Sequence, residues 1–145
     1  MNYSRREVGL MLPALSLGAT EATAAAAQEV SAMQSKVFKY EELAVKKNGE
    51  NEARAVLNGQ NHAGFPVEMH MTKLGPGQAP HPPHHHVHEE MVMLRSGSLD
   101  VMISGKTTRA TAGSVVYVAS NEEHGWKNPG SEPAEYFVIA LGPRS

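Results

Sequence analysis

The sequence contains no cysteine among its 145 residues. Without thiols the chain can form neither a disulfide nor a thiolate zinc site, and it carries no cysteine nucleophile or lipoprotein anchor. An excess of one charge sign is also missing, because the net charge is −2 at pH 7. The composition therefore gives no reason to expect binding to nucleic acid or to an anionic membrane surface.

A hydrophobic run of membrane-spanning length is missing as well. The mildly apolar stretch from Val8 to Ala19 is shorter than the about 20 residues that cross a bilayer. Hydrophobic residues make up 41% of the chain and charged residues 19%, which is the balance of a globular protein. The length suits one domain, and no internal repeat is visible.

The first 27 residues have the layout of an export signal. Arg5 and Arg6 form a basic start, the run from Val8 onwards forms an apolar core, and the alanines that end at Ala27 supply a small-residue cleavage site. The stretch SRREVGL resembles a twin-arginine signal, although Val8 and Gly9 replace the bulky pair that usually follows the arginines. We predict export to the periplasm or the extracellular space, with an uncleaved amphipathic or disordered tail as the alternative.

The rest of the chain is typical of short strands separated by turns. Alternation over 66–74, and β-prone runs over 89–111, 113–120 and 134–142, predict strands, with turns at Asn58-Gly59, Ser96-Gly97 and Ser104-Gly105. The segment 75–83 is rich in residues that cannot continue a sheet and is expected to be a loop. Many short strands in one small domain favour a sandwich or barrel.

Apolar residues within these strands predict the core. The inward-facing set is expected to be Val67, Met69, Leu94, Leu99, Val101, Ile103, Val116, Val118, Phe137 and Ile139. Four strand methionines, Met69, Met71, Met91 and Met93, are expected to pack in the core, with a copper-binding cluster as the alternative.

The stretch HPPHHHVHEE, residues 81–90, holds five of the eight histidines. If it is a strand, His84 and His86 face the same way about 6–7 Å apart, which suits two imidazoles on one ion. Glu90 and His88 share that parity, so the spacing alone does not choose between them. His85 has the opposite parity and is expected to be exposed, as is His81. A solvated histidine run without metal is the alternative.

This spacing resembles the first motif of the cupin family. The family pattern reads G, five residues, H-x-H, three or four residues, E, six residues, G; here His84, His86, Glu90 and Gly97 fit it, and Gly77 precedes by one residue more than the pattern. The second motif reads G, five residues, P-x-G, two residues, H, three residues, N. Gly113, His124 and Asn128 match it, whereas Ala119 replaces the proline and Asn121 the glycine.

The resemblance implies an all-β fold, a double-stranded β-helix of jelly-roll type. It implies that His84, His86, Glu90 and His124 bind one divalent transition metal ion (Mn, Fe, Ni, Cu or Zn) inside the barrel. The expected organisation is an export signal over 1–27, an N-terminal arm with the first strands over 28–60 and the cupin barrel over 61–142. His62 and His70 are expected at the surface or at an interface, with a place in the lining of the pocket as the alternative.

The function implied by the resemblance is that of a metalloenzyme acting on a small oxygen-bearing substrate. A dioxygenase-like oxidoreductase is preferred to an isomerase or lyase, and Glu90 is the candidate catalytic base. Arg54 and Arg109 are candidates for binding a substrate carboxylate, or are surface charges. The alternative is a non-catalytic periplasmic module that binds metal or a small molecule. A homodimer is expected, because an exposed sheet edge invites pairing.

Replacing both Arg5 and Arg6 with lysine is expected to block export, because the paired arginines define the twin-arginine signal. Cell fractionation followed by immunoblotting measures the exported fraction. Undisturbed export of the double variant would contradict the prediction.

Overall fold

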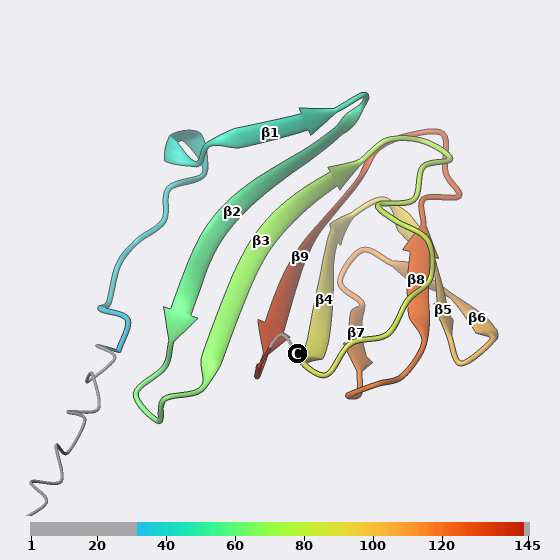
Figure 1. Cartoon of the computed structure of the whole chain (residues 1–145). Helices are drawn as coiled ribbons and strands as arrows, with labels where there is room; N and C mark the ends of the chain where they lie inside the picture. Colours follow the sequence, from blue (N-terminus) through green and yellow to red (C-terminus); the bar gives the residue numbers. More distant parts are fainter. Residues whose placement is uncertain (1–31, 144–145) are drawn as a thin grey trace, which may run out of the picture.

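The computed structural model describes residues 32–143, and its regular elements are almost all strands (Figure 1). The prediction of an all-β jelly roll is confirmed. In chain order the elements are the 3-10 helix η1 (Tyr40–Glu42), β1 (Val45–Asn48), β2 (Asn51–Gln60), β3 (Pro66–Leu74), β4 (Glu89–Ser96), β5 (Ser98–Ile103), β6 (Lys106–Thr111), β7 (Val115–Val118), β8 (His124–Lys127) and β9 (Ala134–Leu141). The predicted export signal lies outside the described residues.

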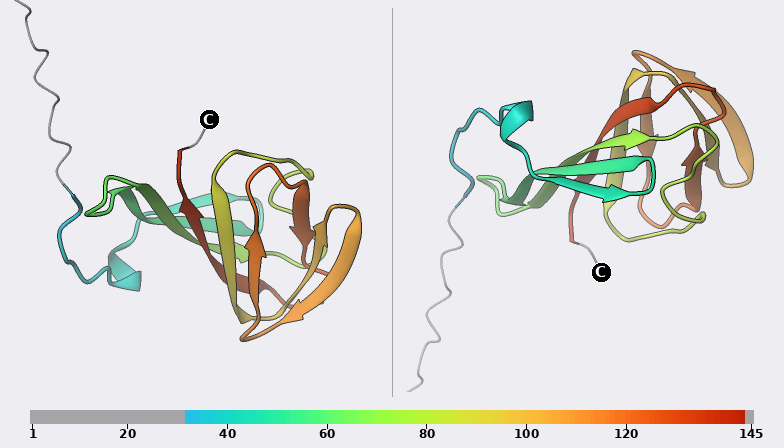
Figure 2. Two further views of the ribbon diagram at one scale, coloured as in Figure 1. Left: turned by 90° about the horizontal axis from the view of Figure 1, so that it is seen from below. Right: turned by 90° about the horizontal axis from the view of Figure 1, so that it is seen from above.

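The strands form two antiparallel sheets of unequal size. The larger has the order β1-β2-β3-β9-β4-β7, and the smaller has the order β6-β5-β8. Figure 2 shows that the smaller sheet faces only one end of the larger one, so that β1 and β2 extend beyond the region where the sheets face each other. Among the described residues no helix is long and apolar enough to span a bilayer.

Two of the three predicted turns lie where expected. Ser104 and Gly105, with φ of 46° and 79°, close the β5–β6 hairpin, which is the geometry of a two-residue primed turn. Gly97 joins β4 to β5, but these strands belong to different sheets, so the turn carries the chain across the barrel instead of pairing its flanks.

The predicted turn at Asn58-Gly59 is wrong, because β2 continues through both residues. The turn that follows this strand falls slightly later, at 61–65, where β2 and β3 form a hairpin and the amide of Gly64 donates to the carbonyl of Asn61 over 3.0 Å. Gly59 serves a different purpose. A Cβ atom there would lie 2.6 Å from Cγ of Met33, so glycine allows the N-terminal arm to approach the strand.

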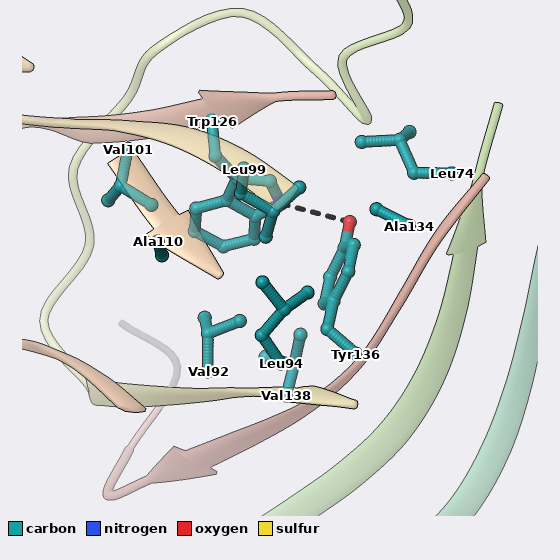
Figure 3. Close-up of a cluster of buried hydrophobic side chains, with 10 residues drawn as sticks. All are labelled: Leu74, Val92, Leu94, Leu99, Val101, Ala110, Trp126, Ala134, Tyr136 and Val138. Atoms are coloured by element: carbon teal, nitrogen blue, oxygen red, sulfur yellow. Dashed lines mark hydrogen bonds between the residues drawn. The ribbon is translucent and has the colours of Figure 1, made fainter. Parts of the chain in front are cut away.

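The core lies between the smaller sheet and the facing strands of the larger one (Figure 3). Its centre includes the Trp126 ring, whose Nε1–H donates to the Tyr136 hydroxyl over 2.9 Å. Burial raises the pKa of Tyr136 to about 12, so the hydroxyl stays protonated at neutral pH. The buried hydrophobic residues are Leu74, Val92, Leu94, Leu99, Val101, Ala110, Val118, Trp126, Ala134, Tyr136 and Val138.

The predicted core is correct for most strands, but the prediction for β9 is wrong. Leu94, Leu99, Val101 and Val118 are buried, and Ile103 and Val116 pack against the core. In β9, however, Tyr136 and Val138 point inward, and Phe137 and Ile139 lie on the outer face of the larger sheet. The run AEYFVIAL is apolar at both parities, so alternation could not assign its inner side.

The outer face of the larger sheet is rich in apolar side chains. On β9, Ile139 lies between Met69 of β3 and Met91 of β4 as the register partner of both. Phe137 lies in the same way between Met71 and Met93. Val115 and Tyr117 continue the face on β7, where they are 61% and 53% exposed. Such a patch is typical of interaction surfaces. The expected homodimer nevertheless stays a prediction.

Gly97 and Gly105 provide a matched pair for testing the crossover. Both have positive φ, of 78° and 79°, but a Cβ at Gly97 would lie 2.8 Å from Cα of Ala134, whereas the same atom at Gly105 meets nothing within 4 Å. Gly105→Ala is expected to cost about 1–2 kcal/mol of unfolding free energy from the left-handed backbone alone. Gly97→Ala is expected to cost about 2–5 kcal/mol, because backbone atoms must also move. Urea denaturation measures both, and equal costs would contradict the role of Gly97.

Candidate metal centre

The histidine-rich stretch is a loop, not a strand, because β4 begins only at Glu89. Its position is nevertheless fixed by one antiparallel backbone bridge. The amide of His84 donates to the carbonyl of His124 over 3.0 Å, and the amide of His124 donates back over 2.9 Å. A residue from the loop and a residue from β8, forty positions apart in the sequence, are thus held side by side.

A close backbone contact seats the loop on β8. A Cβ atom at Gly125 would lie 3.1 Å from Cα of Pro83, so the glycine leaves room for the loop to lie against the strand. Further along the loop, the carbonyl of His86 accepts the amide of Asn121 over 2.8 Å. Asn121 has φ of 61°, which agrees with its place at the glycine position of the second motif. These contacts direct the loop histidines toward the barrel.

The structure brings three of the predicted ligands into one group and places the fourth, Glu90, beside two of them. The ligand nitrogens of His84, His86 and His124 all lie within 4.8 Å of one another, and these three histidines can hold a metal ion. One carboxylate oxygen of Glu90, Oε2, lies 3.1 Å from Nε2 of His124 and 3.3 Å from Nε2 of His86. Glu90 is 8% exposed and His124 is fully buried.

Backbone carbonyls fix which nitrogen of two imidazoles faces the carboxylate. Nδ1 of His86 lies 2.8 Å from the carbonyl oxygen of His88, and Nδ1 of His124 lies 2.9 Å from that of Glu122. A carbonyl can only accept, so Nδ1 carries the proton in both rings. In the neutral tautomer Nε2 therefore presents a lone pair toward Glu90. Sequence reasoning could not name these two carbonyls.

The centre consequently needs positive charge. Two imidazole lone pairs and a carboxylate oxygen are all acceptors, and at about hydrogen-bond distance they repel one another unless a proton or a metal cation lies among them. Metal-binding histidines commonly donate their remote N–H to a backbone carbonyl, as His86 and His124 do here. Imidazole and carboxylate ligands suit Mn, Fe, Ni, Cu or Zn. The residues present therefore fit a divalent transition metal.

The third histidine is also in the form that binds metal. Burial lowers the pKa of His84, and the neighbouring imidazoles of His81, His124 and His86 lower it further. The neutral ring, which is the metal ligand, is thus favoured at neutral pH. Nδ1 of His84 is buried and has no hydrogen-bond partner among residues 32–143.

His88 supports the centre without joining the three-histidine group. Its ring stacks on that of His86 with the centroids 3.6 Å apart and the planes 9° apart. Its carbonyl holds the same ring through Nδ1. Residue parity left His88 and Glu90 as equal candidates for a metal ligand. The structure places the Glu90 carboxylate against the imidazoles of His86 and His124, and it stacks the His88 ring on that of His86. His85 and His81 are exposed, as expected.

Two polar residues, Glu68 and His70, lie on the inner face of β3. His70, expected at the surface, is register partner of Val138, a buried core residue, so it faces the barrel interior. Glu68 lies two residues before it, with Oε1 3.7 Å from Nδ1 of His70. Burial lowers the pKa of His70, and the nearby Glu90 partly opposes this shift. The alternation of Glu68 and His70 carried the signal, but the methionines between them were taken as the inner set.

Neither candidate arginine lies at the centre. Arg54 pairs with Glu52 over 3.1 Å and covers the ring of Tyr40, and Arg109 pairs with Asp100. The methionines of β3 and β4 do not form a copper cluster either, because Ile139 and Phe137 of β9 lie between them.

Comparison with known proteins agrees with this fold. Residues 70–140 match the cupin domain family. No curated protein sequence matches the chain. Among solved structures, an RmlC-like cupin from Shewanella frigidimarina is 20% identical with a TM-score of 0.63, over 77% of this chain and 96% of that one.

Two further structures carry names that imply an activity. A predicted oxalate decarboxylase from Thermotoga maritima is 20% identical with a TM-score of 0.64, over 74% of this chain and all (100%) of that one. The polyketide cyclase RemF from Streptomyces resistomycificus is 18% identical with a TM-score of 0.63, over 77% and 82% of the two chains. The chain therefore has the cupin jelly-roll fold. At these identities the likeness establishes the fold alone.

Replacing His84 or His124 with alanine is expected to lower metal affinity by at least about 100-fold, because the loss of an outer partner alone costs 10- to 100-fold. His85→Ala, in the same loop but exposed, is the matched control and is expected to bind metal as the wild type does. Titration calorimetry with zinc and manganese measures the affinities. Equal affinities for all three variants would place the metal elsewhere or exclude it.

Proposed function

We propose that the chain is a metal-dependent enzyme that acts on a small oxygen-bearing substrate at a centre formed by His84, His86, Glu90 and His124. The observation that carries the proposal is the approach of two imidazole nitrogens, Nε2 of His86 and Nε2 of His124, to one carboxylate oxygen of Glu90. That arrangement is electrostatically unfavourable until a cation occupies it.

A bound divalent metal would supply Lewis-acid polarisation of a substrate oxygen or of water. The protein's own contribution is orientation. The carbonyls of His88 and Glu122 keep the rings of His86 and His124 in the tautomer that presents Nε2, and the ring of His88 holds the plane of His86. An imidazole that is already in place loses little rotamer freedom on binding metal.

Glu90 is the residue we propose for proton transfer. Its carboxylate is nearly buried and lies against two imidazole nitrogens, so it is close to the proposed metal. Such a group can remain a ligand, or can accept a proton from a substrate. His70 and Glu68 provide further polar groups on the same inner face of the larger sheet.

The reaction we favour is oxygen-dependent, of the dioxygenase type. The names of two similar structures, a predicted oxalate decarboxylase and a polyketide cyclase, point to non-oxidative reactions of oxygen-rich substrates as the other outcome. A centre of imidazole and carboxylate ligands accommodates both redox-active and redox-inactive metals, so the metal decides between them.

The test begins with elemental analysis of protein purified from its native compartment. We expect one equivalent of a transition metal per chain, and oxygen uptake with at least one member of a panel of catechols, β-diketones and thiols. A Glu90→Gln variant should keep the shape of the side chain and lose turnover, and His85→Ala should retain turnover. Full metal occupancy without turnover on any of these substrates would support a non-catalytic binding module, and absence of metal would contradict the centre itself.

A further inference from the structure

We propose that a groove between β6 and β7 binds a small organic acid with an apolar or aromatic body, and that this groove is the substrate-binding part of the metal centre. The inference rests on the proposed function, because it names the class of substrate for that site. It is drawn from three features of the groove: its position between two sheet edges, the face of the barrel that lines it and the charge at its rim.

The groove lies where the two sheets fail to meet. β7 is the last strand of the larger sheet and β6 the last strand of the smaller one, and no backbone ladder joins them. Between them is a groove of about 740 Å³. Sites for small molecules commonly enclose about 300–1,000 Å³, so this groove has the size of a substrate site.

The wall of the groove is part of the barrel interior. Val101, Ile103 and Val116 line it. Val101 belongs to the buried core cluster, and the other two pack against that cluster. The inner faces of both sheets are therefore accessible here. An apolar wall of this kind favours an apolar or aromatic body, since each buried methylene contributes about 0.8 kcal/mol.

Strand pairing places the wall of the groove next to two of the proposed ligands. Ile103 is the direct register partner of His124 on the neighbouring strand β8. On the larger sheet, Val118 is the register partner of Glu90. Val116 lies two residues before Val118 on β7 and therefore points to the same face. Neighbouring strands lie about 4.8 Å apart, so the wall begins one strand away from two of the four proposed ligands.

The rim supplies one cation without a protein partner. Lys106 is the register partner of Ile103, so its side chain leaves β6 on the face that the groove occupies. Arg109, the other cation at the groove, is paired with Asp100, and the Glu122 carboxylate accepts the Ser104 hydroxyl over 2.9 Å. Within residues 32–143 the ammonium of Lys106 makes no ion pair. A carboxylate on the ligand would satisfy it.

The test compares three probes on the full-length, metal-loaded protein by titration calorimetry. Phenylacetate carries both an aromatic body and an acid, phenylacetamide lacks the charge, and acetate lacks the body. We expect phenylacetate to bind more tightly than phenylacetamide by up to about fivefold, the contribution of one exposed ion pair. We expect it to bind more tightly than acetate by well over tenfold, because of the apolar area buried.

Two variants and a matched control assign this binding to the groove. Lys106→Gln should make phenylacetate and phenylacetamide bind equally, and Val116→Trp should fill the groove and abolish binding of both. Lys127→Gln removes an exposed lysine at the end of β8 and should change nothing. Because Lys106 is exposed, its replacement leaves the core intact, so the test does not depend on whether Val116→Trp folds.

The outcomes separate this proposal from the metal centre. If metal binds at one ion per chain and both groove variants bind phenylacetate as the wild type does, the groove proposal is wrong and the metal centre stands. If phenylacetate binds no better than acetate, the groove proposal is also wrong. If no metal binds, the metal centre is wrong, and the same comparison on metal-free protein still decides whether the groove binds an aromatic acid.

Discussion

The structure of the site depends on one electrostatic constraint, the position of the Glu90 carboxylate beside two imidazole nitrogens, Nε2 of His86 and Nε2 of His124. The constraint arises because backbone carbonyls of His88 and Glu122 take the Nδ1 protons of His86 and His124. Acceptors that are nearly buried cannot replace these contacts with hydrogen bonds to water. A proton or a metal cation among these groups would relieve the constraint, and the loop, β4 and β8 hold the residues that would bind it.

The sequence was sufficient to predict the fold class and the three histidines that form a group able to hold a metal ion, for different reasons. Alternating and β-prone segments define strands wherever one face is polar, and turn residues mark their ends. The histidines and Glu90 were recognised by their spacing, which resembles that of the cupin family. The premise that the histidines occupy a strand was wrong, yet His84 and His86 still converge, because an extended loop segment bridged to β8 keeps the same alternation of side chains.

The errors have a common physical cause, which is the apolar outer face of the larger sheet. In β3 and β9 both faces carry hydrophobic side chains, so alternation cannot tell inside from outside. Met69 and Phe137 were assigned to the core, and His70 was consequently placed at the surface. The Asn58-Gly59 error is different. An Asn-Gly pair commonly forms a hairpin turn, but here a close tertiary contact with Met33 requires the glycine, and no local pattern encodes such a contact.

The unequal size of the sheets connects these features. Three strands cannot cover six, so the smaller sheet closes the barrel only over the β9, β4 and β7 end of the larger one (Figure 2). Where the loop crosses from β3 to β4, its histidines complete one side of the closure and bring the ligands to β8. On the opposite side no backbone ladder joins β6 to β7, and the seam remains open as the groove beside Lys106. The same deficit of strands thus accounts both for the loop that supplies the proposed metal ligands and for the opening through which a substrate would approach them.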